Sequence, residues 1–350
     1  MIPFARPWIT DEDREAVAAV LAGHVLAHGP EGEMFELEFA EFMGGGYCVA
    51  VSSCAAALHL AYTVYGIGPG DEVIVPAMTH CSTANTVEWT GADCVFVDCD
   101  PATGNVTAEG IRAAITTKTK AIVVVHFVGI PCDMSRISAL AHERGLFLIE
   151  DCALALGARV GGTHVGLWGD AGCFSFYPTK HITTGEGGMF VTRDPDVAER
   201  VKRMRAHGVV RGTNRTYDVP EIGLNYRMGE MQAALGRSQL RRIGTILSRR
   251  RENFRALMRC ALEGYVLDDR GSSNYCLALT RQHPGPESVT WPVHLQMEHS
   301  VYYPHPVPRL AYYQRKYGKF DPSRFPNAVE IADHSAALPV GPHVPLSVLA

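Results

Sequence analysis

Two residues of this chain have types and surroundings suited to covalent chemistry, Lys180 and Asp151. Lys180 lies in Phe174–His181, a stretch rich in aromatic and hydroxyl side chains, and the glycine-rich stretch Thr183–Gly188 follows it. Asp151 ends the apolar run Leu146–Asp151. An amine that can form a Schiff base, together with a carboxylate at a strand end, is what pyridoxal phosphate (PLP) chemistry requires. The pair therefore predicts a PLP site.

Each member of this pair also has an ordinary interpretation. Most lysines are solvated, although the three aromatic residues just before Lys180 predict a buried amine, and burial favours the neutral, nucleophilic form. Asp151 alone fits a helix N-cap equally well, because aspartate is common at strand-to-helix turns. Taken together, the two residues favour PLP.

A PLP site would also need groups that hold the cofactor phosphate. Ser52–Ala55 stands at a predicted strand-to-helix junction, where helix N-terminal amides and hydroxyls bind phosphate. Ser53, Cys54 and Ala55 are therefore candidate cofactor-binding residues, and Ser175 is a second hydroxyl candidate. An ordinary serine cap on a helix is equally consistent with this stretch.

The elements that must position these residues are short apolar runs separated by helical patterns such as Ala56–Val64. Most runs are continuously apolar, which is typical of strands buried on both faces of a sheet. The runs are Tyr47–Val51, Glu72–Val75, Cys94–Asp98, Ala121–His126, Leu146–Glu150, Gly172–Phe176 and Gly188–Thr192. Strands that alternate with helices predict an α/β fold with a mostly parallel sheet.

The character of the sequence changes after about residue 195. Arginines cluster at 200–205, 237–242 and 249–251 within helical patterns, which favours solvated helix faces over a nucleic-acid surface. We expect a large cofactor-binding domain over residues 1–245, which includes the N-terminal segment. A smaller C-terminal domain over residues 246–350 would contain a long helix, a few strands and a Tyr/Pro-rich segment.

Composition and charge argue against several classes of protein. The 350 residues are 47% hydrophobic and 20% charged, with a net charge of −5, which gives no support for nucleic acid or an anionic membrane as partner. The apolar runs are too short to span a bilayer, and Met1–Trp8 shows no secretion signal. The ten cysteines include no Cys-x-x-Cys pair and are typical of reduced thiols, so we expect a cytoplasmic protein.

Two other kinds of site fail on order or spacing. Gly66–Gly70 has the glycines of a dinucleotide-binding loop, but it precedes a strand instead of opening a helix. His294, His299 and His305 match no standard metal-site spacing. We therefore expect neither a dinucleotide nor a metal.

Together these features resemble the DegT/DnrJ/EryC1/StrS family of sugar aminotransferases over almost the whole chain. The block around Lys180 is the most specific part of the resemblance. The matching segments are Val51–Ser53, Ala56–Leu60, Gly66–Pro76, Glu150–Asp151, Phe174–Gly188, Leu224–Met228, Pro326–Ala328 and Leu338–Pro339. The resemblance implies fold type I of the PLP-dependent transferases, with a seven-stranded sheet flanked by helices and a smaller C-terminal α+β domain.

The family pattern implies a role for each candidate. Lys180 would carry the Schiff base and later move protons between substrate and cofactor, and Asp151 would pair with the pyridine nitrogen. Ser175 would bind the cofactor phosphate, and Asn225 would reach the phosphate in the neighbouring subunit, which implies a homodimer with shared active sites. His80 falls where the family usually has an aromatic residue stacked on the cofactor ring. An ordinary loop histidine is the alternative for that position.

Two positions depart from the family pattern. The family commonly has Gly-Thr or a similar pair where this chain has Cys54 and Ala55, so a hydroxyl is lost while the backbone amides remain. The family usually has Gln or His near the phenolic oxygen of the cofactor, where this chain has Leu154, which cannot hydrogen-bond. Either another group contacts that oxygen or the electronics of the ring are tuned differently.

The resemblance implies an aminotransferase that moves an amino group from an amino acid, glutamate in the first instance, to a nucleotide-linked keto sugar in amino-sugar biosynthesis. A dehydratase or other PLP lyase is one alternative: the dehydratase branch of the family replaces the lysine with histidine, and His181 and Leu154 keep it open. A cyclitol or other non-nucleotide ketone as acceptor is another alternative, and a non-catalytic relative is the third. Candidates for the acceptor pocket are Tyr217, Tyr226, Arg227, Tyr303 and His305.

Overall fold

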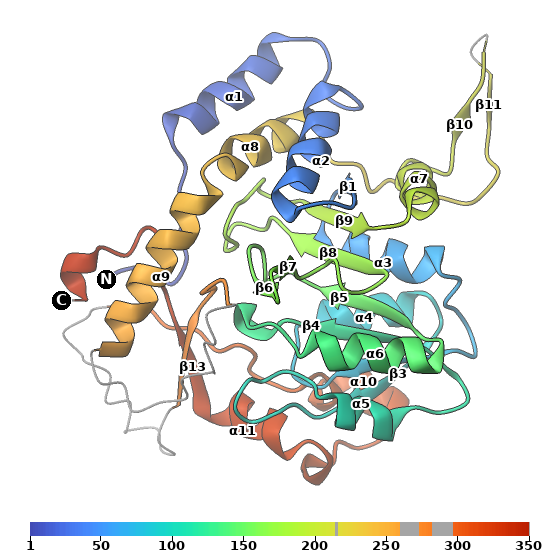
Figure 1. The fold of residues 1–350 in the computed structure, drawn as a ribbon, viewed down its shortest axis with the longest axis vertical. Helices are drawn as coiled ribbons and strands as arrows, with labels where there is room; N and C mark the ends of the chain where they lie inside the picture. Colours follow the sequence, from blue (N-terminus) through green and yellow to red (C-terminus); the bar gives the residue numbers. More distant parts are fainter. Residues whose placement is uncertain (214–215, 260–272, 282–296, 350) are drawn as a thin grey trace.

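The computed structural model describes residues 1–213, 216–259, 273–281 and 297–349, so Cys260 and His294 lie outside the described residues. A seven-stranded sheet forms its centre, in the order β1-β9-β8-β5-β4-β2-β3 (Figure 1). The strands are β1 (Tyr47–Val51), β2 (Glu72–Pro76), β3 (Asp93–Val97), β4 (Thr119–Val125), β5 (Phe147–Asp151), β8 (Ala171–Ser175) and β9 (Gly188–Thr192). Every neighbouring pair is parallel except the two that β9 makes with β8 and β1. The expected α/β fold and mostly parallel sheet are confirmed, and each predicted apolar run forms one strand within a residue or two.

Helices cover both faces of the sheet, which explains why its strands are continuously apolar. Val49 and Val51 of β1 belong to a core shared with α3 (Cys54–Val64), α4 (Cys81–Trp89) and α7 (Pro195–Met204). Cys48 and Ala50 face the opposite way and pack with α2 (Pro30–Met43) and α8 (Glu230–Leu240). Further along that second face lie α5 (Ala108–Ala114) and α6 (Met134–Arg144). Because both sides of each strand are buried, polar and apolar residues do not alternate along these strands.

Two parts of the chain lie outside the sheet. Helix α1 (Asp11–Ala22) precedes the sheet in the sequence, and α9 (Ile243–Arg259) follows it and leads into a C-terminal segment. That segment contains an antiparallel pair, β12 and β13, and the helices α10 and α11 (Figure 1). Its elements and the remaining short ones are β12 (Ala278–Arg281), α10 (Ala311–Tyr317), α11 (Pro326–His334), β13 (Ser335–Leu338), η1 (Phe127–Gly129), η3 (Val307–Arg309), η4 (Pro322–Arg324), η5 (Leu346–Val348), β6 (Arg159–Val160), β7 (Thr163–His164), β10 (Val210–Arg211) and β11 (Tyr217–Asp218). The division into domains at residues 245 and 246 stays a prediction.

Among the helices in the described part of the chain, none combines the length and the apolar character that crossing a bilayer requires.

Candidate active site

Several predicted site residues meet at the edge of the sheet where its parallel strands end. Asp151 is the last residue of β5, and Ser175 is the last of β8. Because β9 runs the opposite way, its first residue, Gly188, lies at this edge, opposite Ser175 and Val51. Ser53 follows β1 and precedes α3. Parallel α/β sheets bind ligands at this edge, so the topology brings these residues to the expected place.

Asp151 is a buried carboxylate that accepts hydrogen bonds from separate parts of the chain, and it is only 4% exposed. Its Oδ1 accepts from the backbone nitrogen of Ala153 at 3.0 Å and lies 3.8 Å from Sγ of Cys54. Its Oδ2 accepts from the Thr83 hydroxyl at 2.8 Å. The residues directly after Asp151 form turns and not a helix, so the helix N-cap interpretation is wrong. Each carboxylate oxygen can accept about two hydrogen bonds, so Oδ2 retains a position for the N–H of a ring.

Thr83 is a site residue that the sequence did not reveal. It is fully buried on α4, and its hydroxyl lies 2.8 Å from the Thr79 hydroxyl. If Thr79 donates to Thr83, the Thr83 proton points to Asp151, and the carboxylate receives an oriented donor. Threonines on a buried helix face are common, so the sequence carried no signal that singled out Thr83.

Replacing Thr83 by valine should lower kcat/KM about ten- to hundredfold. The change keeps the branched shape but removes a hydrogen bond to a charged group, which contributes roughly 1.5–3 kcal/mol. Steady-state kinetics and the pH dependence of cofactor absorbance would measure the effect. Thr83→Ser keeps the hydroxyl and should restore most of the activity. If Thr83→Val matched the wild type in both measurements, Thr83 would only fill space.

The predicted phosphate cradle lies between the start of α3 and the start of β9. The Ser53 hydroxyl accepts from the backbone nitrogen of Ala56 at 3.0 Å, so Ser53 does cap the helix. Gly188 packs against this turn, because a Cβ there would lie 2.5 Å from the Ser53 carbonyl carbon. The Cys54 thiol lies near Asp151, and burial raises the pKa of Cys54 well above its ordinary value, so the thiol stays neutral. Backbone amides and the Ser53 hydroxyl are thus the groups that this turn offers to a phosphate, while Ala55 adds only its amide.

Lys180 lies in the connection between β8 and β9. Its backbone nitrogen donates to the carbonyl of Tyr177 at 2.9 Å. Phe174 and Phe176 are buried as the sequence predicts, but Tyr177 is exposed and Lys180 is partly buried. The lysine lines a small cavity together with Leu154, the residue that departs from the family pattern. The lysine is therefore partly enclosed by protein and partly accessible.

Ser175 and Asn225 are the two remaining candidates for the phosphate. The partly buried Ser175 hydroxyl accepts from the backbone nitrogen of Tyr177 at 3.4 Å. Asn225 is exposed, and the residue after it holds the end of β1, since the Ser52 nitrogen donates to the Tyr226 carbonyl at 2.8 Å. The segment of Asn225 thus lies beside the cradle of its own chain, and its reach to a neighbouring subunit stays a prediction.

His80 stands at the start of α4, with its ring exposed on one side. Its Nδ1 accepts from the backbone nitrogen of Ser82 at 3.2 Å, so the histidine caps the helix. The ring lies edge-on to Tyr303, with centroids 5.6 Å apart. Desolvation lowers the pKa of His80, while the negative charge of Asp151 opposes this change. A neutral imidazole near Asp151 is compatible with stacking on a cofactor ring, which stays a prediction.

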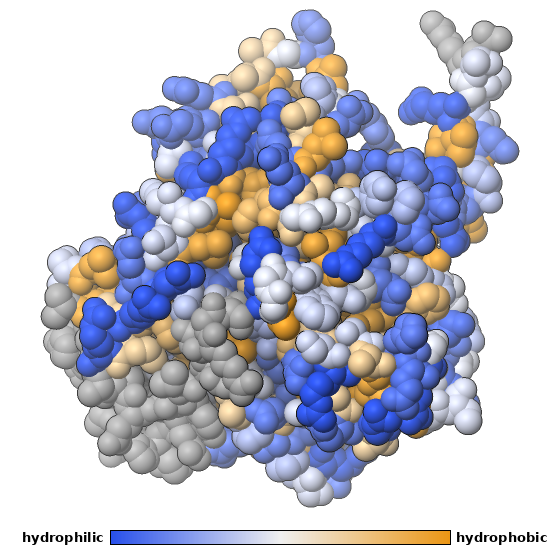
Figure 2. Space-filling view, viewed as in Figure 1, coloured by the Kyte–Doolittle hydropathy of each residue, from blue (hydrophilic) through white to orange (hydrophobic). Residues whose placement is uncertain are grey.

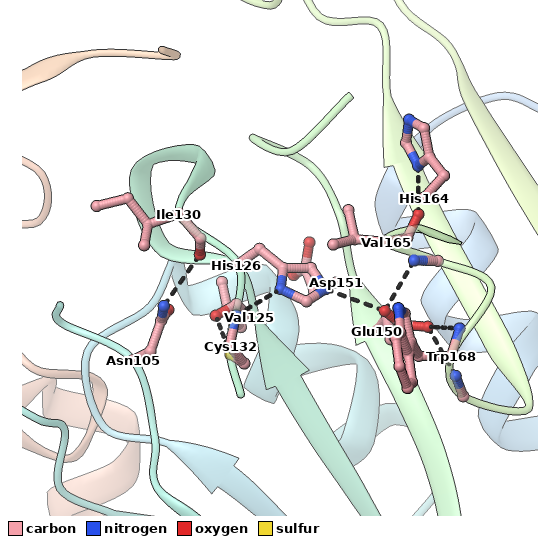
Figure 3. Close-up of polar contacts among 12 residues, drawn as sticks. Asn105, Val125, His126, Ile130, Cys132, Glu150, Asp151, His164, Val165 and Trp168 are labelled. Carbon is pink, nitrogen blue, oxygen red and sulfur yellow. Dashed lines mark hydrogen bonds and ion pairs between the residues drawn. The ribbon is translucent and has the colours of Figure 1, made fainter. Parts of the chain in front are cut away.

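A second buried carboxylate, Glu150, precedes Asp151 and anchors the strand that carries it (Figure 3). Its two oxygens accept four hydrogen bonds of 2.7–3.1 Å, from Nε2 of His126 and from the backbone nitrogens of Gly166, Trp168 and Gly169. Nδ1 of His126 accepts from the Cys132 nitrogen, so the ring proton is on Nε2 and points to Glu150. The backbone nitrogen of His126 also donates to the backbone carbonyl of Asp151 at 3.3 Å. The network therefore fixes the backbone of Asp151.

His126, Glu150 and Cys152 place ligand-type atoms within 4.8 Å of one another, but their bonding is that of a structural network. The oxygens of Glu150 each already accept two hydrogen bonds, and both ring nitrogens of His126 are bonded. Burial raises the pKa of Cys152 well above its ordinary value, and a neutral thiol is a poor metal ligand.

Comparison with known proteins places this sheet edge in context. The model of the DegT/DnrJ/EryC1/StrS aminotransferase family matches residues 7–347. The chain belongs to this family. Its resemblance to the DegT/DnrJ/EryC1/StrS family, expected from the motifs, is confirmed.

Relatives and solved structures of the DegT/DnrJ/EryC1/StrS family match most of the chain. The spore coat polysaccharide biosynthesis protein SpsC of Bacillus subtilis (strain 168) is 38% identical over an alignment 362 residues long. The alignment covers 97% of this chain and 92% of SpsC. The GDP-perosamine synthase of Escherichia coli O157:H7 is 42% identical over 252 residues, or 72% of this chain and 69% of the synthase. The PLP-form of Spr1654 from Streptococcus pneumoniae has a TM-score of 0.89 at 25% identity, and the match covers 99% of this chain and 95% of Spr1654.

This member of the DegT/DnrJ/EryC1/StrS family is thus a PLP-dependent aminotransferase of fold type I. The residues at the sheet edge fit that cofactor. Asp151 offers a buried oxygen with an open acceptor position, and Lys180 supplies an amine. The turn at Ser53, against which only glycine fits at position 188, supplies backbone amides for a phosphate.

Proposed function

We propose that this aminotransferase moves an amino group from glutamate to a nucleotide-linked keto sugar in the biosynthesis of an amino sugar. Its relatives support the acceptor class, since one is a GDP-perosamine synthase and another a spore coat polysaccharide biosynthesis protein. The observation that carries the proposal is the arrangement of Asp151, with its open acceptor position, at the same sheet edge as the connection that carries Lys180.

Two residues would perform the proton chemistry. Bound PLP supplies an aldehyde that takes up amino groups and a ring that withdraws electrons from the adjacent carbon. Lys180 would hold the cofactor through its amine, and the same amine, once displaced by the donor, would carry a proton from the α-carbon of the donor to the cofactor. Asp151 would keep a proton on the pyridine nitrogen. The donor would lose its amino group and its α-proton and leave as an oxo acid whose new oxygen comes from water. The keto sugar would gain the amino group and a proton delivered by Lys180, and its carbonyl oxygen would leave as water.

The remaining candidates would bind and orient. The turn at Ser53, Cys54 and Ala55 would hold the phosphate through amides and one hydroxyl, with Ser175 as a further donor. His80 would cover one face of the ring. These contacts would fix the cofactor so that the Lys180 amine reaches the reacting carbon.

The geometry disfavours the dehydratase alternative. His181, the residue that kept it open, is buried, and its Nε2 donates to the Asn274 carbonyl at 3.2 Å. Burial also lowers the pKa of His181 well below its ordinary value, so the ring stays neutral and bonded within the protein. Transamination by Lys180 is therefore the reaction that we propose.

We also propose that the enzyme works as a homodimer. The β10–β11 hairpin stands clear of the body in both whole-molecule views (Figures 1 and 2). It carries exposed Tyr217, and Ile222 after it is 88% exposed. A second copy would bury these side chains and bring Asn225, which follows on the same exposed segment, toward the cradle of its neighbour.

Mixing two inactive variants tests this arrangement. Lys180→Ala and Asn225→Asp should each be inactive alone, since the aspartate would repel the phosphate. If Asn225 acts across the interface, co-expressed subunits should regain activity, because some sites take both intact residues. No recovery in a mixture that does form heterodimers would place Asn225 in the site of its own chain.

We place the enzyme in the cytoplasm. In the described residues nine cysteines are free, and all but Cys81 are buried. Free thiols in such number suit a reducing compartment.

A screen of nucleotide-linked keto sugars with glutamate or glutamine, read by mass spectrometry, tests the function directly. Gain of an amino group by one of them supports the proposal, and loss of water would point to a dehydratase instead. If only cyclitols or free ketones were aminated, the acceptor class would be wrong while the aminotransferase mechanism would stand.

A further inference from the structure

Cys54 places a thiol in the candidate site at a position where the family commonly has glycine. It is the first residue of α3, directly after the Ser53 cap, and its side chain is buried in the core that α3 shares with the sheet. Burial raises the pKa of Cys54 well above its ordinary value, so the thiol keeps its proton. A buried thiol that keeps its proton is a hydrogen-bond donor, although a weak one.

Two acceptors compete for this single proton. The Sγ atom of Cys54 lies 3.4 Å from the backbone carbonyl oxygen of Cys173 and 3.8 Å from Oδ1 of Asp151. The carbonyl is nearer, but the carboxylate is charged, and a hydrogen bond to an ionised acceptor is roughly twice as strong as one to a neutral acceptor. All three residues are buried, where a charge is screened far less than in water. The carboxylate is therefore the acceptor that gains most from the thiol.

Counting the thiol nearly fills the hydrogen-bonding positions of Asp151. Oδ1 accepts from the backbone nitrogen of Ala153 at 3.0 Å, so a second donor completes its capacity of about two hydrogen bonds. Oδ2 accepts from the Thr83 hydroxyl at 2.8 Å and retains one position. Without the thiol, Oδ1 would also retain a position, and the N–H of a ring could approach either oxygen. With the thiol, the contacts of the described residues leave only Oδ2 open.

We propose that Cys54 is a positioning residue, which donates its thiol proton to Oδ1 of Asp151 and thereby reserves Oδ2 for the cofactor. This inference rests on the proposed function, in which Asp151 keeps a proton on the pyridine nitrogen. The thiol acts through the carboxylate and touches no substrate. Cys54 and Thr83 belong to different helices, α3 and α4, and each donates to a different oxygen, so together they hinder rotation of the carboxylate.

The stretching vibration of the thiol tests this donor directly, whether or not an amino group is transferred. An S–H bond absorbs infrared light at a frequency where other protein groups absorb little, and the frequency falls when the proton is donated more strongly. The difference between the spectra of wild type and Cys54→Ala isolates the Cys54 band. The same difference in an Asp151→Asn background should show the band at a higher frequency, because the acceptor has lost its charge. An unchanged band would assign the proton to the Cys173 carbonyl and overturn the inference.

Cys132 provides the matched control. It is also a free, buried thiol, and its Sγ lies 3.3 Å from the backbone carbonyl oxygen of Val125. The band that Cys132→Ala removes should keep its frequency when Asp151 is replaced by asparagine. A shift of both bands would indicate a general change in the core and would count against the inference.

The affinity for PLP gives a second test, in which the full chain is titrated with the cofactor and followed by absorbance. Cys54→Ala should weaken binding about two- to tenfold, the effect of losing one modest hydrogen bond. In the Asp151→Asn background the same change should cost much less, because the thiol acts through the charge of Asp151. Equal losses in both backgrounds, or an equal loss in Cys132→Ala, would indicate a structural role and overturn the inference. If both tests are met but no keto sugar is aminated, the acceptor proposal fails and this inference stands.

Discussion

Lys180→Ala should lower kcat for amino transfer by roughly 10²–10⁴-fold, the contribution that a positioned acid–base group makes. The variant loses the amine that would both hold the cofactor and move the proton between two carbons. The change should be small for the fold, since Lys180 is partly buried and its backbone nitrogen donates to Tyr177 whatever the side chain. Single-turnover absorbance with glutamate would measure the loss directly, before any acceptor is known.

Lys118 provides the control for Lys180. It is exposed in the loop before β4, and its backbone makes hydrogen bonds with Thr116 and Glu72 that do not depend on its side chain, so Lys118→Ala should retain wild-type rates. Lys180→Arg keeps a positive charge but cannot form the Schiff base, and it should be as inactive as Lys180→Ala. Full turnover by Lys180→Arg would contradict the proposed mechanism.

Asp151→Asn should lower kcat about 10²–10³-fold, as loss of one preorganised electrostatic contact does. Asparagine can keep the bond from Ala153 through its oxygen, and its amide can donate to the Thr83 oxygen, so the local structure should survive. It cannot, however, hold a proton on the pyridine nitrogen by charge. The cofactor should still bind, which its absorbance would show, while proton removal from glutamate becomes slow.

Asp133 is the matched control for this change. Its side chain accepts from the Arg136 nitrogen at the start of α6, and asparagine caps helices as well as aspartate does. Asp133→Asn should therefore leave both kinetics and stability near wild type. If Asp151→Asn were equally silent, Asp151 would not be the partner of the ring.

The sequence predicted those parts of the molecule that depend on local pattern. Continuous apolar runs identify strands because both sides of this sheet are covered, and the last residue of a run that forms a parallel strand lies at the ligand-binding edge. That is why Asp151 could be placed at a strand end, and Ser53 at a helix start, before any coordinates. The aromatic and glycine-rich surroundings of Lys180 set it apart from surface lysines in the same way.

Contacts between distant segments could not be predicted. Thr83 reaches Asp151 across 68 positions, and nothing around it distinguishes it from other threonines. The four donors to Glu150 come from two separate segments, so its role is visible only in three dimensions. The cluster of three arginines at 249–251 within a helical pattern predicts a solvated face. Arg249 and Arg251 are exposed as expected, whereas Arg250, four residues after the buried Ile246, lies on the buried side.

The reversed direction of β9 has a consequence for how enzymes of this build can change. Every parallel neighbour in the sheet is reached by a crossover, and the loops of a crossover can take up added residues. The connection from β8 to β9 is instead a return, pinned where the Phe176 nitrogen donates to the Gly187 carbonyl at 2.9 Å. A residue inserted between this point and Lys180 would displace the Lys180 amine from the ligand edge. We therefore expect this loop to tolerate no change of length, while the crossovers are free to vary and to reshape the acceptor side.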